Sequence, residues 1–251
     1  MYKTVDLQVG DKLLRGCVRT PQGSGPFPTV CFYHGFSVDR VGLLRLHEML
    51  ARLLVDHGFA CVRFDFYGCG ESDGDFSEMR VSDEIVQGKA IYEWACKQDF
   101  AISEKVYPVG HSLGGVIASI VAATYQTPAA ILWSPALSVY YDISGRVGAV
   151  PDHYEPTYDL DGLEFSGEFL KDVRSLDLLK MAAGYKNKVL IIHGDKDEKI
   201  TVAVTGQYRD LYGDAMKLVI VKGSNHQFSS KSWRQQAYDA TLAFLKQEIS
   251  R

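Results

Sequence analysis

The sequence predicts an α/β fold built on a mostly parallel, doubly wound sheet of eight strands. Two observations support this prediction. Along most of the 251 residues, short apolar runs alternate with stretches at helical spacing, an order typical of parallel sheets covered by helices on both faces. Hydrophobic residues make up 46% and charged residues 23% of the chain, as in ordinary globular proteins, and a chain of this length can bury a large core without disulfides.

The elements follow in order from the N-terminus. Two short runs, 2–9 and 12–20, predict an antiparallel hairpin at one edge of the sheet. The apolar run 29–33 is typical of a buried strand. Leucines at helical spacing predict a helix over about 41–57, which ends at Gly58. Further strands are expected at 59–66, 105–109, 129–133, 189–192 and 216–221, and further helices at about 82–98, 113–125, 201–212 and 231–249.

Residues 135–184, the insertion, interrupt this alternation. The insertion is too long for a plain connection in a compact domain. We expect a cap over the carboxyl ends of the strands, because clefts of open α/β sheets lie at that edge. The alternative is a surface excursion with a small core of its own. The prediction is therefore one domain, 1–251, with an inserted cap subdomain (lid) at 135–184. Its aromatic residues are Tyr140, Tyr141, Tyr154, Tyr158, Phe165 and Phe169.

The most informative motif is Gly-His-Ser-Leu-Gly-Gly at 110–115, between an expected strand and an expected helix. Glycines two positions on either side of Ser112 match the nucleophile-elbow pattern G-x-S-x-G. The turn is so tight that Cβ atoms at Gly110 and Gly114 would clash, and its strain lifts the serine hydroxyl clear of the sheet. Ser112 is therefore the candidate nucleophile.

A serine nucleophile requires a base and a group that orients the base. His226 is the histidine that follows the last expected strand, and the chain order Ser…Asp…His favours it as the base. Three carboxylates precede it at a strand end: Asp195, Asp197 and Glu198. We favour Asp197 as the orienting acid, because the loop must turn at Gly194 before a carboxylate can point back. Asp195 would then stabilise the turn.

The oxyanion requires hydrogen-bond donors. The elbow supplies the backbone N–H of Leu113 at a helix N-terminus, where partial positive charge helps. We expect the N–H of Phe36 to be the second donor, because Gly35 lets that backbone approach the site. His34 and His193 each precede a glycine at a strand end, and we expect structural hydrogen bonds from them.

Composition argues against several classes of partner. A net charge of −4 gives no indication of a nucleic-acid or anionic-membrane partner. Zinc-ligand spacing and a dinucleotide-binding loop are both missing, so no cofactor and no metal are expected. Five cysteines without a C-x-x-C pair predict reduced thiols. The N-terminal residues lack the apolar core of a signal peptide and no run approaches the ~20 apolar residues of a membrane span, so we expect a cytoplasmic location.

Five motifs occur in order at expected strand ends. They are His34-Gly35-Phe36, Asp65 with Gly68-x-Gly70-x-Ser72, the elbow at 110–115, His193-Gly194-x-x-Asp197, and Asn225-His226. This set resembles the α/β-hydrolase superfamily over nearly the whole chain. The resemblance implies an α/β-hydrolase fold, and it implies Asp197 as the acid, since His-Gly-x-x-Asp is the family's usual setting for that residue.

Three further features narrow the resemblance. They are the run Phe64-Asp65-Phe66-Tyr67-Gly68-x-Gly70-x-Ser72-Asp73-Gly74-x-Phe76, the run Met79-x-Val81-x-x-Glu84-Ile85, and the insertion. These features are similar to the bacterial cinnamoyl (feruloyl) esterases, in which an Asp and a Tyr of the cap contact the hydroxyls of a hydroxycinnamate ring. The resemblance implies Asp142 as the acid. Phe169 stands where the tyrosine is expected, with Tyr140 and Tyr141 nearby, and Leu113 replaces the common Gln.

Together these residues predict a serine carboxylester hydrolase. Ser112 attacks the ester carbonyl carbon and His226 takes its proton. Asp197 holds the imidazole, and the N–H groups of Phe36 and Leu113 bind the oxyanion. The expected partner is a small-molecule ester with an aromatic, feruloyl-type or short-to-medium acyl group, and a homodimer is a reasonable assembly. Two alternatives stay open: a peptidase-like enzyme, thioester hydrolase or acyltransferase with the same machinery, and a non-catalytic ligand-binding protein of the same fold.

Overall fold

The computed structural model describes residues 1–250, and its main sheet has eight strands. The strands are β1 (Tyr2–Val9), β2 (Lys12–Arg19), β3 (Phe27–Tyr33), β4 (Ala60–Phe64), β5 (Ala101–His111), β6 (Ala129–Trp133), β9 (Lys188–Gly194) and β10 (Met216–Val221). The helices outside the insertion are α1 (Leu46–Asp56), α2 (Val81–Cys96), α3 (Leu113–Tyr125), α7 (Val204–Tyr212) and α8 (Lys231–Ile249). Short 3-10 turns lie at Leu43–Arg45, Phe76–Glu78 and Gly213–Ala215.

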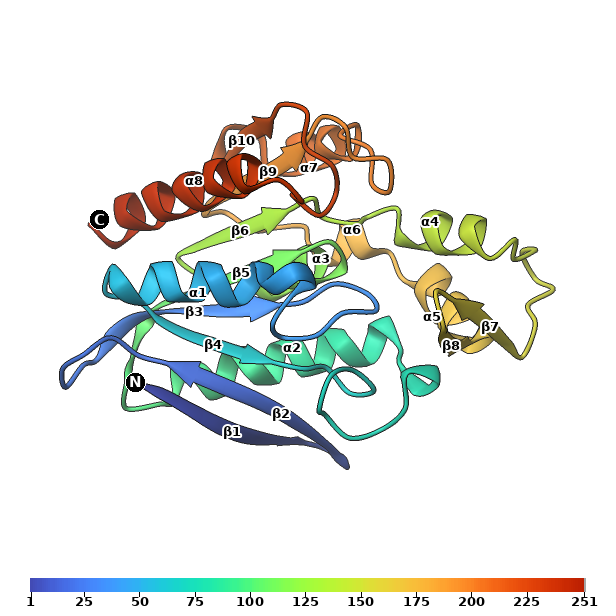
Figure 1. Ribbon diagram of the computed structural model, residues 1–251. Helices are drawn as coiled ribbons and strands as arrows, with labels where there is room; N and C mark the ends of the chain where they lie inside the picture. Colours follow the sequence, from blue (N-terminus) through green and yellow to red (C-terminus); the bar gives the residue numbers. More distant parts are fainter. Residues whose placement is uncertain (251) are drawn as a thin grey trace.

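The sheet has the predicted mostly parallel, doubly wound topology. Its strand order is β1-β2-β4-β3-β5-β6-β9-β10. The pairs β1/β2 and β2/β4 are antiparallel, and the pairs from β4 to β10 are parallel. The predicted fold class and the antiparallel hairpin at one edge are therefore confirmed. The carboxyl ends of the parallel strands all lie at the same edge of the sheet (Figure 1).

Helices cover both faces of the sheet (Figure 1), and two clusters of buried hydrophobic residues form the core. On one face, Leu50 of α1 and Leu245 of α8 are buried against the strands. On the other face the core holds residues of α2, α3 and α7, including Ile117. Neighbouring strand residues alternate between the cores, with Ile191 in one and Ile192 in the other, as the two-residue period of a strand requires. Burial on both faces explains why the central strands are continuous apolar runs.

The helix expected over 41–57 begins only at Leu46. Leu44 and Arg45 have φ angles of 53° and 65°, in the left-handed region that a right-handed helix cannot include. Leu43–Arg45 forms a 3-10 turn instead. The leucine spacing therefore extends beyond the helix, and the turn frees Leu43 to line a hollow near Ser112.

The insertion contains its own short elements. They are α4 (Val139–Arg146), the antiparallel pair β7 (Thr157–Leu160) and β8 (Leu163–Ser166), α5 (Gly167–Ser175) and α6 (Leu178–Met181). In Figure 1, α4, α5 and the β7–β8 pair lie beyond the ends toward which the parallel strands point. Phe165 and Phe169 are buried in the same core as α2 and α3. The insertion therefore packs onto the main body of the fold.

The cysteines and the helices bear on two further expectations. All five cysteines are free thiols, and Cys17, Cys31, Cys61 and Cys69 are buried. Burial raises the pKa of Cys31 and of Cys61, so both thiols are protonated and pack as small apolar side chains. Across residues 1–250, no helix is both long enough and apolar enough to cross a bilayer.

Candidate active site

Ser112 lies at the sharp turn between β5 and α3. Its φ and ψ angles are 59° and −123°, a strained conformation for a residue with a side chain. A Cβ on Gly110 would lie 1.9 Å from the carbonyl oxygen of Gly114, and a Cβ on Gly114 would lie 2.0 Å from that of Tyr33. The backbone contacts leave room for glycine alone at both positions, and the turn sets the serine at the carboxyl end of β5.

The loops after β9 and β10 bring two further side chains to this serine. Nε2 of His226 lies 3.0 Å from Oγ of Ser112, and Nδ1 of His226 lies 2.7 Å from Oδ2 of Asp197. The histidine side chain is 10% exposed and the aspartate side chain is fully buried. With Nδ1–H donating to the carboxylate, Nε2 is free to accept the serine proton. The arrangement can move a proton from serine to imidazole.

The Asp197 carboxylate is held by several donors. Its Oδ1 accepts the N–H groups of Lys199 at 3.1 Å and Ile200 at 2.8 Å, and Nε2 of His193 lies 3.3 Å from Oδ2. Burial acts to raise the pKa of Asp197, but hydrogen bonds from His193 and His226 lower it more, so the pKa lies below its ordinary value. The carboxylate therefore stays ionised, the form that orients an imidazole and stabilises its cation.

The other two carboxylates after β9 have different surroundings. Oδ1 of Asp195 accepts the N–H of Gly223 at 2.6 Å, and Glu198 is exposed. Within residues 1–250, neither forms a hydrogen bond or ion pair with His226. A Cβ on Gly194 would lie 2.2 Å from the carbonyl oxygen of Ser224. The chain therefore makes its tight turn at that glycine, before the carboxylate that reaches the histidine.

The β3 exit loop, residues 34–42, passes close to the serine. A Cβ on Gly35 would lie 3.0 Å from Cβ of Ser112, so glycine permits the approach. Within residues 1–250, no acceptor is hydrogen-bonded to the backbone N–H of Phe36 or of Leu113. Leu113 begins α3, where helix N–H groups are unpaired and carry partial positive charge. Two unpaired donors near a serine hydroxyl are what an oxyanion hole requires.

A hollow of about 280 Å³ opens over Ser112 and His226. The exit loops form one side of it, and α4 with the β7–β8 pair forms the other. Its lining combines apolar and polar residues in similar proportion, and such a concave site can hold a small molecule. The insertion contributes the apolar residues Ala136, Val139, Ile143, Leu160 and Leu163, and the charged residues of the lining are Asp142, Arg146, Asp161 and Lys199.

Of the four side chains expected to bind an acyl group, only Asp142 lines this hollow. Tyr140 and Tyr141 line a separate hollow of about 240 Å³, and Oη of Tyr140 lies 2.8 Å from Oη of Tyr154. The reason is helical geometry: positions 139, 142, 143 and 146 share one face of α4, and the two tyrosines lie on another. The structure therefore does not place either tyrosine beside Ser112.

Phe169 also lies away from the hollow. Its side chain is fully buried, and its ring centroid lies 5.0 Å from that of Phe36. Phe169 packs against Phe36 of the β3 exit loop and can support that loop. The structure does not place Phe169 in the lining of the hollow, and its contact with an acyl group stays a prediction.

Asp142 is a largely buried carboxylate without a close partner. Its side chain is 16% exposed, and the nearest cationic atom, Nη1 of Arg146, is 3.9 Å away. Nη2 of Arg146 lies only 2.8 Å from Asp161. Burial raises the pKa of Asp142, although Arg146 opposes the shift. Within residues 1–250 no donor is hydrogen-bonded to this carboxylate, so it can accept a hydrogen bond from a ligand.

His111 is a residue of the site that sequence reasoning did not single out. Nε2 of His111 donates to the carbonyl oxygen of His226 at 2.8 Å, and the two ring centroids are 4.9 Å apart. Burial and the neighbouring His226 lower the pKa of His111 to about 3, so its ring is neutral and its single N–H goes to that carbonyl. The elbow motif places a residue before Ser112, but nothing in its spacing shows where that side chain points. Arg146 and Lys199 also line the hollow, and no motif in the sequence indicates it.

The other histidines near the site form structural hydrogen bonds, as expected. Nδ1 of His34 donates to the carbonyl oxygen of Gly35 at 2.9 Å, and Nε2 accepts the N–H of Phe66 at 3.0 Å. Nε2 of His193 donates to the carbonyl oxygen of Ile200 at 2.8 Å. Over the described residues, 1–250, no group of three or more His, Cys, Asp or Glu side chains is arranged to hold a metal ion.

Two family models each match more than half of the chain. The model of the X-Pro dipeptidyl-peptidase (S15 family) matches residues 10–165, and that of an uncharacterised protein family (UPF0227) matches residues 93–242. Both matches include the elbow. The first also covers the β3 exit loop, and the second covers Asp197 and His226.

Curated relatives match parts of the chain. An Escherichia coli protein described as an uncharacterized 31.7 kDa protein in the traX-finO intergenic region is 32% identical over 97 residues, which are 39% of this chain and 33% of that protein. Lysophosphatidylserine lipase ABHD12 of Danio rerio is 26% identical over 201 residues, which are 76% of this chain and 49% of the lipase. The chain thus spans a third to a half of the length of these relatives.

A solved structure matches the whole fold. Est1E from Butyrivibrio proteoclasticus with bound ferulic acid superposes with a TM-score of 0.89 at 24% identity, over 98% of this chain and 100% of that chain. The similarity covers the main sheet and the insertion alike. Together with the family models it confirms the resemblance seen in the sequence: the chain belongs to the α/β-hydrolase superfamily and to the families that the two models describe.

Proposed function

We propose that the protein is a serine hydrolase that cleaves carboxylic esters through an acyl-enzyme. The observation that carries the proposal is the hydrogen-bonded chain from Ser112 through His226 to the buried Asp197. The unpaired N–H groups of Phe36 and Leu113 near the serine add the second requirement of such an enzyme.

In the first half-reaction, Oγ of Ser112 attacks the ester carbonyl carbon and Nε2 of His226 takes the hydroxyl proton. The carbonyl oxygen becomes an oxyanion and accepts hydrogen bonds from the N–H groups of Phe36 and Leu113. Asp197 stabilises the imidazolium without taking its proton. The intermediate then collapses, the bond to the alcohol breaks, and the imidazolium gives the proton to the leaving alkoxide.

In the second half-reaction, water replaces the alcohol. Nε2 of His226 takes a proton from the water as its oxygen attacks the acyl carbon. The same N–H groups bind the second oxyanion, and the bond to Oγ of Ser112 breaks as the imidazolium returns the proton to the serine. The acid is released and the enzyme is restored.

The proposed substrate is a small ester with an aromatic, hydroxycinnamate-type or short-to-medium acyl group. Apolar walls over Ser112 and the unbonded carboxylate of Asp142 support it, because that carboxylate can accept a hydrogen bond from a hydroxyl. Two comparisons agree with ester chemistry: the Est1E structure has ferulic acid bound, and the Danio rerio relative is a lipase.

A peptidase is the second candidate. The match to the X-Pro dipeptidyl-peptidase model favours it, since the same catalytic groups can cleave amides. Asp142 could then pair with the terminal ammonium of a peptide, because a carboxylate accepts hydrogen bonds from an ammonium as well as from a hydroxyl.

Turnover of three substrates distinguishes these functions: methyl ferulate, p-nitrophenyl acetate and alanyl-proline p-nitroanilide. We expect hydrolysis of the two esters and little of the anilide, and we expect Ser112→Ala to lower kcat by about 10⁶-fold. Preference for the anilide would establish the peptidase instead. Failure of the wild-type protein to cleave any of the three, or to react with a fluorophosphonate, would favour a non-catalytic binding protein.

A further inference from the structure

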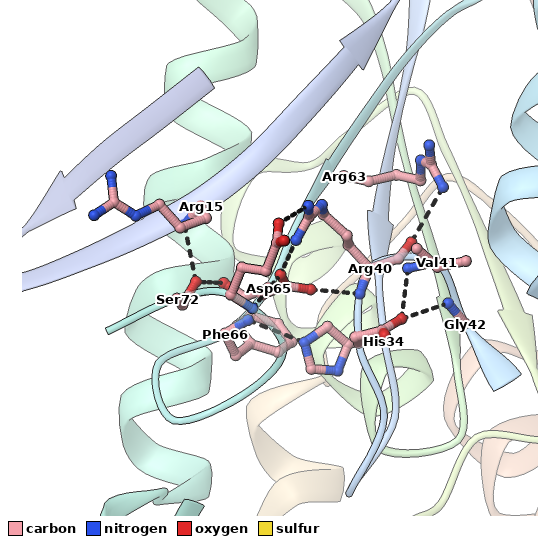
Figure 2. Close-up of polar contacts among 11 residues, drawn as sticks. Arg15, His34, Arg40, Val41, Gly42, Arg63, Asp65, Phe66 and Ser72 are labelled. Atoms are coloured by element: carbon pink, nitrogen blue, oxygen red, sulfur yellow. Dashed lines mark hydrogen bonds and ion pairs between the residues drawn. The ribbon is translucent and has the colours of Figure 1, made fainter. Parts of the chain in front are cut away.

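A buried polar network joins the β3 exit loop to the β4 exit loop, residues 65–75 (Figure 2). Its centre is the carboxylate of Asp65, which is fully buried. Oδ1 accepts the backbone N–H of Arg40 at 2.6 Å, Oδ2 accepts that of Glu71 at 2.9 Å, and the guanidinium of Arg40 pairs with Oδ2. A Cβ on Gly70 would lie 2.3 Å from this carboxyl group, so a glycine makes room for it. Both loops thus converge on one side chain.

The network also reaches the sheet. The hydroxyl of Ser72 donates to the carbonyl oxygen of Asp65 at 2.7 Å and accepts the N–H of Arg15, on β2, at 2.8 Å. Nη1 of Arg63, on β4, donates to the carbonyl oxygen of Arg40 at 3.3 Å. Figure 2 shows these contacts from the strands inward to the two loops. Asp65 is therefore anchored to the rigid part of the fold.

Phe36 lies between the two points at which this network holds the β3 exit loop. On one side, the ring of His34 accepts the N–H of Phe66. On the other side, Arg40 is bound to Asp65. The two partners are neighbours in the β4 exit loop. The ring of Phe36 packs against three further rings, those of Phe76, Phe165 and Phe169.

We propose that Asp65 and Arg40 are positioning residues, whose buried pair fixes the β3 exit loop so that the N–H of Phe36 points at the developing oxyanion. The inference rests on the proposed serine hydrolase function. An oxyanion hole is effective because its donors are in place before the charge forms, and small misplacements of reacting groups lower the rate steeply. A buried ion pair adds little net stability compared with apolar residues of similar volume, although removal of one partner alone is destabilising. We therefore expect the pair of Arg40 and Asp65 to act mainly by holding the N–H of Phe36 in position.

The test compares Arg40→Gln with wild type on p-nitrophenyl acetate and on an inhibitor, 1,1,1-trifluoro-4-phenylbutan-2-one. Oγ of Ser112 adds to the ketone carbon, His226 takes the proton, and the carbonyl oxygen becomes a stable oxyanion in the hole. We expect kcat to fall by about tenfold or more, short of the 10²–10³-fold lost when a donor is deleted. The inhibition constant of the ketone should rise by a similar factor, while KM changes less than about twofold.

Three further variants separate positioning from stability. Asp65→Asn keeps an oxygen for one N–H but loses the charge, and we expect the same pattern from it. Arg40→Lys keeps the charge and should recover part of kcat. Arg19→Gln is the matched control, because it removes an arginine from another buried carboxylate, Glu48. Arg19→Gln should lower the melting temperature of the protein without raising the inhibition constant of the ketone.

The outcomes are distinct. Parallel losses of kcat and of ketone affinity in Arg40→Gln that are absent from Arg19→Gln support the positioning role. If Asp65→Asn does not fold, the comparison of Arg40→Gln with Arg19→Gln is sufficient to decide. If Arg40→Gln affects kcat and ketone affinity no more than Arg19→Gln does, the pair is structural and the inference is overturned. A wild-type protein that reacts with neither the ester nor the ketone overturns the proposed function and this inference with it.

Discussion

The strand-exit loops and the insertion face each other across one hollow, but they hold their side chains in different ways. In the exit loops, Asp197 is bound by two backbone N–H groups and by His226, and glycine-lined turns fix Ser112. In the insertion, Asp142 has no ion-pair partner closer than 3.9 Å within the part of the chain that the structure describes. The side chains that move the proton are thus held by bonds within the protein, whereas the Asp142 carboxylate is available to a ligand.

This difference separates reaction from substrate choice. Residues whose bonds are satisfied within the protein can act in the same way on every substrate, because their geometry does not depend on the ligand. A carboxylate that lines the hollow and has no bond to the protein can accept a hydrogen bond from a ligand, and the strength of that bond depends on the ligand's structure. Changes in the exit loops should therefore affect all substrates equally, and changes in the insertion should affect some of them.

The largest expected effect comes from Asp197→Asn. The amide cannot stabilise the imidazolium of His226, and its N–H₂ group favours the wrong tautomer, so kcat should fall by about 10⁴-fold. Initial rates with methyl ferulate and p-nitrophenyl acetate measure it, and the loss should be the same for both. Asp195→Asn is the matched control two residues away and should leave kcat near the wild-type value. Equal losses in the two variants would show that Asp197 has no special role.

A smaller and selective effect is expected from Asp142→Asn. If the carboxylate accepts the ring hydroxyl of a hydroxycinnamate, kcat/KM for methyl ferulate should fall by about tenfold, the value of one hydrogen bond to a charged group. The value for p-nitrophenyl acetate should stay within about twofold, because its acyl group has no hydroxyl. Tyr141→Phe, on another face of α4, is the control and should change neither. Equal losses of kcat/KM on both esters would contradict the assignment of substrate choice to the insertion and of the reaction to the exit loops.

The smallest effect concerns Glu84 of α2, where the insertion packs against the main body of the fold. Its side chain is buried, and among residues 1–250 neither carboxylate oxygen has a hydrogen-bond partner. Burial together with Asp172 and Asp83 raises its pKa well above the ordinary value. Because the pKa of Glu84 is higher in the folded than in the unfolded state, wild-type stability falls as pH rises above the unfolded-state pKa of about 4.3. In urea denaturation, Glu84→Gln should match the stability of wild type near pH 4 and become the more stable of the two as pH rises toward 8.

Glu48 supplies the control of opposite sign for this denaturation experiment. Burial acts to raise its pKa, but hydrogen bonds from Arg52 and Arg19 and the charge of Arg63 lower it to about 2. Its stabilising contribution is present above the unfolded-state pKa and is lost as pH falls toward 2. Glu48→Gln should therefore be less stable than wild type at pH 7, with the difference shrinking in acid. A pH-independent difference for either glutamine variant would refute the assigned cause.

The positions of the strand-exit loops could be predicted from the sequence, whereas those of the side chains in the insertion could not. Leu113–Tyr125 and Ala129–Trp133 are a helix and a strand with the predicted bounds, because the elbow marks where one element ends and the next begins. Each candidate of the proton-transfer chain stands at the end of a parallel strand, and these ends meet at one edge. Chain order alone could therefore indicate which loops come together.

No comparable rule, such as the meeting of parallel strand ends at one edge, places the side chains of the insertion. Whether Tyr140 or Asp142 faces the hollow depends on where α4 begins and how it is rotated, and neither follows from an aromatic-rich sequence. In the same way, the leucine spacing could not show the left-handed backbone at Leu44 and Arg45. The pairing of Arg40 with Asp65 joins loops far apart in the chain, and spacing within either loop carries no trace of it.

The acyl-enzyme is the central claim, and intact-mass spectrometry tests it most directly. Wild-type protein mixed with p-nitrophenyl acetate and quenched in acid should gain the mass of one acetyl group, and peptide mapping should place that group on Ser112. The Ser112→Ala variant should gain none. Fast hydrolysis by the wild-type protein with the acetyl group on another residue, or equal labelling of the two proteins, would contradict the account.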